Sequence, residues 1–294
     1  MEITSIDNKV KQVVSNIRNL PTPPIVFHQI QKVMSNPDVS AAQIASILSE
    51  DPAMSAKVLK LTNSAFYGLA REVDSVKHAV VNVGIEAIKN LVLSASVLDM
   101  FKGGELDKEF HEKHWRHSLA TGFCCRMLAS KLKKHGFVNS DSAFSAGLLH
   151  DIGKMVIVCY LQDDYAKVGQ ERELDKQSMD WEIEKRVLGY THAEVGAVLI
   201  QVWKLPEKMG EAIFYHHNPL ESNGEEVMPY LINLSNYLSN RTFLDEHEKY
   251  LAGSVDPAVL EFLGTTEEEL EQYTEGLKAE YVKAETFMQI AGIG

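Results

Sequence analysis

Six histidine and aspartate side chains between residues 117 and 217 have the chemistry of metal ligands. Imidazole and carboxylate groups suit zinc, iron, manganese or nickel, and one ion needs about three or four protein ligands. The set is therefore large enough for one complete site and part of a second. It consists of His117, the pair His150-Asp151, His192 and the pair His216-His217.

The neighbours of these side chains are largely apolar, which indicates that the segments carrying them pack inward. A single histidine on an apolar face is more often a hydrogen-bonded core residue than a ligand. Two polar pairs beside a core face are harder to explain in that way, because their burial costs free energy that metal coordination offsets. The neighbours in question are Leu148, Leu149, Ile152, Val195, Ile213 and Phe214.

Helix signals recur along the whole sequence, whereas alternating patterns long enough for several strands are missing from it. Ser40-Ala41-Ala42-Gln43 matches a capping box, and Asp51-Pro52 matches an N-cap followed by proline. A helix is expected to begin at each of these points, so the sequence predicts an all-α fold. Further helices are expected at about 3–18, 24–35, 75–81, 84–100, 106–134, 140–150, 154–169, 176–188, 192–203, 207–216, 228–240 and 266–289.

The clearest break in the first half of the chain is Gly103-Gly104. We therefore expect residues 1–103 to form an N-terminal helical half. Residues 104–294 would form a helical core together with a C-terminal helix. In a helical bundle, side chains from separate helices build a metal site in the core, so the histidines are expected to meet in this second part.

Composition limits the compartment and the partners. The net charge of -12 argues against general nucleic-acid binding, which depends on neutralising phosphates. The odd number of cysteines, Cys124, Cys125 and Cys159, favours a reducing compartment. No secretory signal begins the sequence, and no apolar run approaches the length of a membrane span. We expect a cytoplasmic protein without a membrane segment.

Two groups of motifs carry a family resemblance. His150-Asp151-Ile152-Gly153-Lys154 resembles the signature of the HD superfamily of metal-dependent phosphohydrolases, and the other histidines follow in the expected order. Four upstream motifs resemble the HDOD (HD-related output domain) family, so that the likeness covers about residues 16–240. It implies an HD-like helical core with a packed N-terminal helical half. The upstream motifs are Leu20-Pro21-Thr22-Pro23-Pro24, Asp51-Pro52-Ala53-Met54, Leu61-Thr62-Asn63-Ser64-Ala65 and Val83-Gly84.

The resemblance also assigns ligand positions. His117, His150, Asp151, His192, His216 and His217 match metal ligands of the related HD-GYP proteins. Asn236 stands where those proteins have a last aspartate, and its amide carbonyl can coordinate but carries no charge. One divalent transition metal ion is therefore expected, with a second ion as the alternative. Asn218-Pro219-Leu220-Glu221 replaces the Gly-Tyr-Pro segment, which argues against hydrolysis of cyclic dinucleotides.

The resemblance implies two functions. The first is a bacterial-type signalling and regulatory protein that retains a metal-binding site and acts through contacts with signalling proteins. The alternative is a metal-dependent phosphohydrolase acting on a nucleotide or another phosphoester. In that enzyme, Asp151 would bind or bridge the metal while Lys154 meets the phosphate. Lys154 could equally be an exposed surface lysine.

Glu184 has two readings as well. Its carboxylate could orient a ligating imidazole from outside the ligand set. It also lies in the charged run Glu182-Ile183-Glu184-Lys185-Arg186, which is typical of a solvated helix face.

Overall fold

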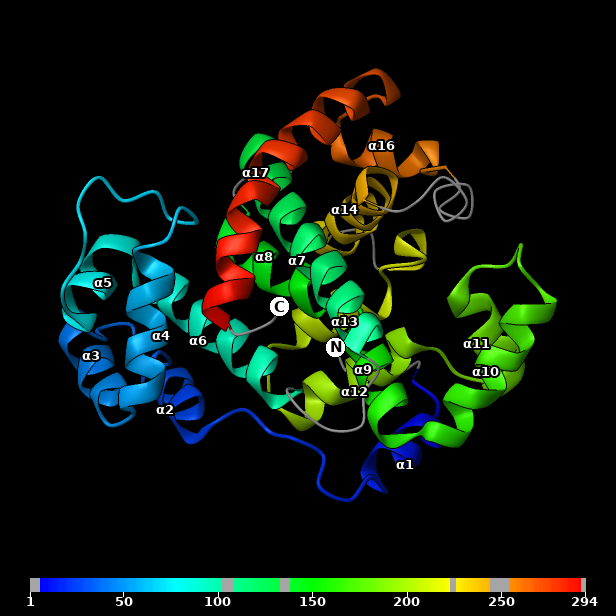
Figure 1. The fold of residues 1–294 in the computed structure, drawn as a ribbon, viewed down its shortest axis with the longest axis horizontal. Coiled ribbons are helices and arrows are strands. Elements are labelled where there is room, and N and C mark those ends of the chain that lie inside the picture. The colour runs from blue at the N-terminus through cyan, green and yellow to red at the C-terminus, as the bar shows by residue number, and fades with distance from the viewer. Residues whose placement is uncertain (1–5, 102–107, 133–137, 223–225, 244–253, 292–294) are drawn as a thin grey trace. The chain divides into compact units, whose positions relative to one another are not determined.

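The computed structural model describes residues 6–101, 108–132, 138–222, 226–243 and 254–291. Helices and connecting loops account for all of these residues, and none of them lies in a strand. The all-α prediction is therefore confirmed. Figure 1 shows the helices along the chain.

The chain divides into two compact units. The core unit comprises residues 1–20 and 104–278, and the accessory unit comprises residues 21–103 and 279–294. A single division at Gly103-Gly104, which lies outside the described residues, would place residues 1–20 and 279–294 in the opposite units. The helix near the start of the chain thus packs within the unit that holds the histidines.

The accessory unit is built from helices with clear starting signals. The Ser40 hydroxyl accepts from the Gln43 N–H at 3.3 Å and the Gln43 side chain accepts from the Ser40 N–H at 2.8 Å, which is the predicted capping box. The Asp51 carboxylate accepts from the Met54 N–H at 2.9 Å, with proline next to it. Its helices are α2 (Ile25–Val33), α3 (Ala41–Ser49), α4 (Pro52–Thr62), α5 (Val76–Val83) and α6 (Ile85–Met100), followed by the end of α17.

The core unit contains α1 and the elements from α7 onward. Its interior is formed by fully buried side chains such as Trp115, Phe123 and Trp203. Its elements are α1 (Asn8–Ser15), α7 (Lys108–Lys131), α8 (Ser140–Leu149), α9 (Ile152–Tyr160), α10 (Gln162–Leu174), α11 (Asp180–Leu188), α12 (His192–Val202), α13 (Glu207–Phe214), η1 (Pro219–Glu221), α14 (Val227–Phe243), α16 (Pro257–Leu263), η2 (Glu267–Glu269) and the first part of α17 (Leu270–Ala291).

Glycines allow two pairs of core helices to approach closely. A Cβ atom on Gly147 of α8 would lie 2.9 Å from the Gly122 Cα of α7. A Cβ atom on Gly153 of α9 would lie 1.9 Å from the His192 carbonyl oxygen at the start of α12. No side chain fits in either gap, so these glycines set the spacing of α7 with α8 and of α9 with α12.

Helix α1 is fastened to the end of α11. The Lys9 ammonium donates to the Leu188 carbonyl at 2.7 Å, where the last carbonyls of α11 lack partners within the helix. Val10 and Val14 on the same helix are buried. Helix α1 therefore holds the turn that leads from α11 into His192.

Four elements differ from the sequence-based expectation. The helix predicted at 3–18 spans only Asn8–Ser15. The helix predicted at 154–169 is two helices, because Leu161 leaves the helical conformation at φ -125° and ψ 52°. The helix predicted at 176–188 begins only at Asp180. Helix α16 was not predicted, although Asp256-Pro257 gives it the same start as Asp51-Pro52 gives α4.

One segment has the length and mean hydropathy of a membrane span, which differs from the expectation that no run approaches that length. It is Ser140–Tyr160, and 78% of its most apolar stretch is buried inside the fold. His150 and Asp151 interrupt it between α8 and α9. Helices α5 and α6 reach the same criteria only when taken together, with a bend of 116° between them. The cytoplasmic location stays a prediction.

Candidate metal centre

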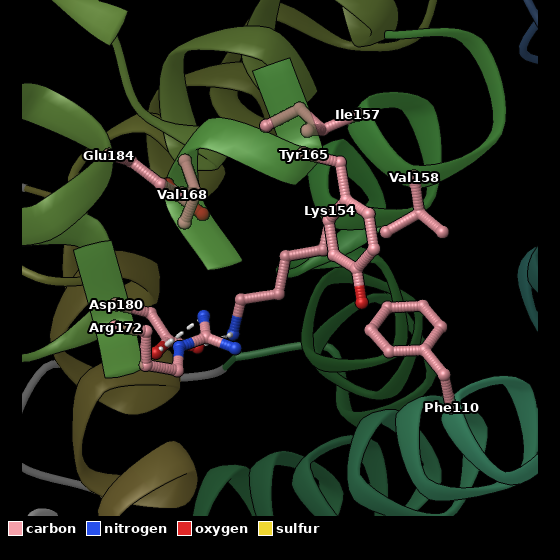
Figure 2. A pocket seen from close by; sticks show the side chains of 9 residues that line it. All are labelled: Phe110, Lys154, Ile157, Val158, Tyr165, Val168, Arg172, Asp180 and Glu184. Carbon is pink, nitrogen blue, oxygen red and sulfur yellow. Dashed lines mark ion pairs between the residues drawn. The ribbon is translucent and has the colours of Figure 1, made fainter. Parts of the chain in front are cut away.

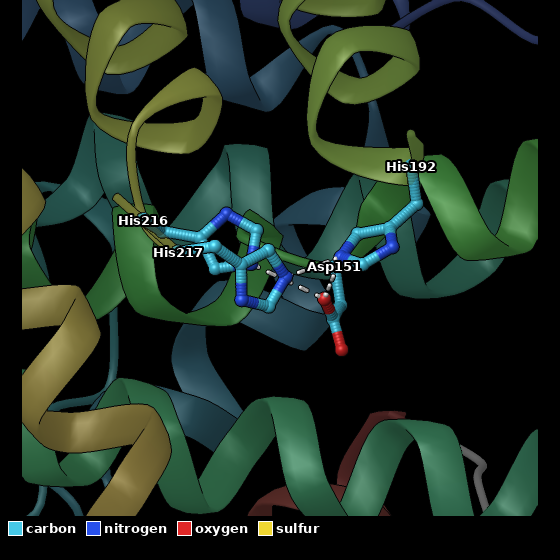
Figure 3. Close-up of side chains that lie close together, drawn as sticks. All are labelled: Asp151, His192, His216 and His217. Atoms are coloured by element: carbon cyan, nitrogen blue, oxygen red, sulfur yellow. Dashed lines mark hydrogen bonds and ion pairs between the residues drawn. The ribbon is translucent and has the colours of Figure 1, made fainter. Parts of the chain in front are cut away.

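The six side chains with ligand chemistry meet in the core unit, and five of them lie at helix ends. His117 lies within α7, whereas His150 and Asp151 occupy the break between α8 and α9. His192 is the first residue of α12, and His216 and His217 follow α13. Figure 3 shows the rings of His192, His216 and His217 gathered around Asp151.

The Asp151 carboxylate lies between two groups of imidazoles. Its Oδ1 is 3.0 Å from His192 Nε2 and 3.6 Å from His216 Nε2. Its Oδ2 is 3.5 Å from His150 Nε2 and 3.8 Å from His117 Nε2. Each carboxylate oxygen therefore faces a different set of ring nitrogens.

Within each group, the ligand atoms lie within 4.8 Å of one another. One group contains Asp151, His192, His216 and His217, and the other contains His117, His150 and Asp151. The first group offers the four ligands that a complete site needs, whereas the second offers three.

Hydrogen bonds to backbone carbonyls fix the direction of two rings. The Nδ1 of His150 lies 2.7 Å from the Gly147 carbonyl, and the Nδ1 of His216 lies 2.6 Å from the Ile213 carbonyl. Because a carbonyl oxygen only accepts, both Nδ1 atoms carry the hydrogen, and in the neutral ring Nε2 keeps a lone pair. These lone pairs point inward, as in metal-ligating histidines.

His192 is oriented by a carboxylate instead. Glu184 Oε2 accepts from the His192 Nδ1 and from the His192 backbone N–H, each at 2.7 Å. Glu184 is 5% exposed, so the reading as a solvated helix face is wrong for this residue. Its carboxylate therefore fixes the orientation of the His192 ring.

Burial keeps most of the rings neutral. It lowers the pKa of His216 to about 3, that of His117 to about 4, and those of His150 and His217 well below the ordinary value. Burial acts in the same direction on His192, but the carboxylates of Glu184 and Asp151 outweigh it and raise the pKa of that ring to about 9.

One buried ring nitrogen in the cluster, His216 Nε2, lacks a hydrogen-bond partner among the described residues. It faces Asp151 Oδ1 at 3.6 Å. A carboxylate oxygen and an imidazole lone pair repel at such a distance unless a cation or proton lies between them. The donor set of nitrogen and carboxylate oxygen therefore fits a divalent transition metal ion.

Lys154 belongs to the cluster rather than to an exposed surface. Its ammonium lies 2.7 Å from Asp151 Oδ2 and 3.9 Å from Asp180 Oδ2, and the side chain is 25% exposed. Burial alone would lower the pKa of Lys154, but Asp151 and Asp180 outweigh it and raise this pKa, so the ammonium stays charged.

Asn236 lies at the edge of the cluster. Its side chain acts to raise the pKa of His117, against the effect of burial, and its Oδ1 accepts from the Asn240 amide at 3.2 Å. All seven predicted metal-site residues and Lys154 therefore come together in one region. Their roles as ligands or catalytic groups stay predictions.

Sequence reasoning missed several residues around the cluster. Trp181 stacks on His217 with ring centroids 5.5 Å apart and an angle of 22°. His114, one turn before His117, is buried and its Nε2 lacks a partner among the described residues. The spacing of Trp181 and Glu184 on one face of α11 was the available signal, but the charged run that contains Glu184 and follows Trp181 pointed instead to a solvated helix face.

Three solved structures share the fold over nearly all of this chain. An HDOD domain protein of unknown function from Geobacter sulfurreducens has a TM-score of 0.73 at 23% identity, with 97% of each chain covered. A protein from Shewanella amazonensis SB2B, provisionally named a phosphohydrolase, also has a TM-score of 0.73 at 23% identity, covering 97% of this chain and 98% of its own. A protein from Marinobacter aquaeolei VT8, provisionally named a signal transduction protein, has a TM-score of 0.77 at 22% identity. The match covers 98% of this chain and 67% of that protein.

The sequence comparisons agree with the fold. A curated relative, an uncharacterized protein of Treponema pallidum (strain Nichols), is 28% identical over 241 residues. This alignment covers 81% of the chain but 45% of the relative, so the chain spans less than half of that protein. The model of the HDOD domain matches residues 20–219, which is more than half of the sequence. The chain belongs to the HDOD domain family.

Proposed function

We propose that this protein is an HDOD signalling module that holds one divalent transition metal ion in its core and acts through contacts with partner proteins. The observation that carries the metal site is the fixed direction of three rings. The Nδ1 hydrogens of His150, His192 and His216 are held by outer acceptors, so their Nε2 atoms face Asp151. Iron, manganese, zinc or nickel suits this donor set.

Asp151, His192, His216 and His217 would hold the ion, since they form the four-ligand group. His117, His150 and Asn236 would form the weaker second position, where a neutral amide stands in place of a charged carboxylate. An ion bound in the native protein adds to its stability, because the unfolded chain does not bring these side chains together.

Burial of the ligands favours a regulatory role. His150, His192 and His216 are fully buried and Asp151 is 2% exposed. The provisional name of the Marinobacter protein supports a signalling role for this chain as well.

One observation favours the alternative of a phosphohydrolase. Lys154 joins the cluster to a pocket, because its ammonium pairs with Asp151 while its side chain lines that pocket. A bound ion would lower the pKa of a water molecule and polarise a phosphoryl oxygen. Lys154 would then orient the anionic group of the substrate, Glu184 would hold His192 in place, and the buried rings would exclude bulk water. The provisional name of the Shewanella protein supports this alternative.

Elemental analysis of protein purified without added metal tests the site. We expect about one transition metal ion per chain, and a lower melting temperature after chelation. The variant His216→Ala should lose the ion, whereas His78→Ala, which changes an exposed histidine paired with Asp74, should keep it. A metal-free protein whose melting temperature does not respond to chelation or to added metal would refute the site.

Turnover separates the two functions. The metal-loaded protein is assayed with p-nitrophenyl phosphate and bis(p-nitrophenyl) phosphate. Metal without hydrolysis is expected for the signalling module. Hydrolysis that disappears in Asp151→Asn and persists in His78→Ala would instead establish the enzyme.

A further inference from the structure

A pocket lies beside the cluster of histidine and aspartate side chains, within the core unit. It encloses about 390 Å³ of empty space, including its opening to solvent, and its walls come from α7, α9, α10 and α11. Lys154 and Glu184 belong both to this wall and to the surroundings of the cluster. A molecule bound here would therefore lie next to side chains that contact Asp151 and His192.

One side of the pocket is apolar. Ile157 and Val168 are buried, at 3% and 4% exposure. The rings of Phe110 and Tyr165 meet edge to face with centroids 6.1 Å apart, and Tyr165 is 38% exposed. These side chains form a surface for a ring or a branched hydrocarbon group.

The other side is polar and already holds a carboxylate between two cations. Arg172 Nη2 lies 2.8 Å from Asp180 Oδ1, and Lys154 Nζ lies 3.9 Å from Asp180 Oδ2. Figure 2 shows the ends of Lys154 and Arg172 next to Asp180, away from Phe110 and Val158. The chain's own aspartate thus shows that this end of the pocket accommodates a planar group with one negative charge.

The ion pair that holds the Asp180 carboxylate is partly exposed to solvent. Asp180 and Arg172 have side chains 43% and 45% exposed, and ion pairs at such positions contribute little to stability. The other two carboxylates nearby are occupied, because Glu184 accepts from His192 and Asp151 pairs with Lys154. Asp151 and Glu184 stay beside the site when Asp180 is displaced, and their negative charges repel a dianion more strongly than a monoanion.

We propose that this pocket binds a small carboxylic acid with an aromatic or branched apolar body. Its carboxylate lies between Arg172 and Lys154 in place of Asp180, and its body packs against Phe110, Ile157 and Val168. Because Lys154 also pairs with Asp151, a ligand bound in the pocket changes the electrostatic environment of the histidine and aspartate cluster. The ligand is thus a small-molecule signal for the proposed regulatory module, although its binding does not require the metal.

Calorimetric titration of the full chain with phenylacetate tests this inference. Phenylacetamide is the neutral control probe, and phenyl phosphate is the dianionic one. Phenylacetate should bind at least about tenfold more tightly than either, since a charge-assisted hydrogen bond is lost in the amide and carboxylate repulsion opposes the dianion. Equal binding of phenylacetate and phenylacetamide would refute the carboxylate site.

Two variants are expected to change affinity in opposite directions. Arg172→Gln should weaken phenylacetate binding about tenfold. Asp180→Asn should strengthen it several-fold, because the competing carboxylate is removed. Arg186→Gln, which removes an arginine paired with Glu171 and Asp175 outside the pocket wall, should leave the affinity unchanged.

The inference fails if Asp180→Asn binds more weakly than the unmodified protein. It also fails if neither protein binds phenylacetate at about 10 mM, well above a weak millimolar Kd. All titrations are repeated after chelation. Binding that persists in a protein shown to hold no metal would support the pocket while the metal site fails, so the two proposals are tested separately.

Discussion

Replacing Gly153 with alanine is the sharpest test of how the fold positions the cluster. The new Cβ atom would lie 1.9 Å from the His192 carbonyl oxygen and 2.8 Å from the Gly196 nitrogen. Real Cβ contacts stay above 3.0 Å, so α9 and α12 would have to separate by about 1.1 Å. Both neighbours are backbone atoms, and no change of side-chain rotamer relieves the contact.

The cost of this separation is large. Overpacking of a core costs about 1–3 kcal/mol where side chains give way, so a contact with backbone is expected to cost at least about 3 kcal/mol. For a unit of this size, 3 kcal/mol lowers the melting temperature by about 6–12 °C. His192 Nε2 lies 3.0 Å from Asp151, and a shift of about 1 Å there should weaken metal binding about 10- to 100-fold.

The assay combines thermal unfolding with titration of the metal-free protein by Co²⁺, whose visible spectrum reports the ligand set. The matched control is Gly169→Ala within α10, where a Cβ atom meets nothing within 4 Å. It should keep metal binding and gain up to about 1 kcal/mol in stability. If Gly153→Ala melts and binds Co²⁺ as Gly169→Ala does, the spacing of α9 and α12 does not position His192, and the reasoning is wrong.

Three further predictions concern the surroundings of the cluster. Glu184→Gln should weaken Co²⁺ binding about 10- to 100-fold, because His192 loses the carboxylate that orients it. Lys9→Met should lower the free energy of unfolding by about 1 kcal/mol in denaturant titrations, whereas Lys11→Met, on the exposed side of α1, should not change it. The metal-free protein should lose stability as the pH falls from 6.5 toward 4. Over that range His117 and His216, whose pKa values in the folded protein are about 4 and 3, take up protons mainly in the unfolded chain. Each of them should lower the free energy of unfolding by up to about 1.4 kcal/mol per pH unit. Equilibrium unfolding in buffers of decreasing pH measures this loss.

Local sequence signals predicted the start of a helix well where the contacts that stabilise this start lie within the same few residues. The capping box at Ser40 and the start at Asp51-Pro52 are examples, since each depends on contacts within one turn. The break at Leu161 could not be predicted, because Tyr160 and Gln162 are compatible with a continuous helix and no proline or glycine marks the change of direction. The placement of residues 1–20 depends on a contact between Lys9 and Leu188, which no local pattern reveals.

In the candidate site, too, contacts between residues far apart in the sequence could not be predicted. Residue types and the family motif identified the six side chains, but not which atoms face one another. That Asp151 presents one oxygen to His192 and the other to His150 follows from the approach of α9 to α12, which Gly153 permits. Glu184 was ambiguous because its neighbours in sequence are charged, whereas its neighbours in space are the buried His192 ring and backbone.

A proton and a metal ion would compete for the same nitrogen of His192. Glu184 fixes the hydrogen on Nδ1, so the second proton of the charged ring must be on Nε2, the atom that lies 3.0 Å from Asp151. The raised pKa of about 9 means that the metal-free protein keeps this proton at neutral pH. A metal ion bound at His192 would need the same lone pair, so its binding would displace the proton. The proton offsets the negative charge of Asp151 in the metal-free protein, and a bound ion would take over that role.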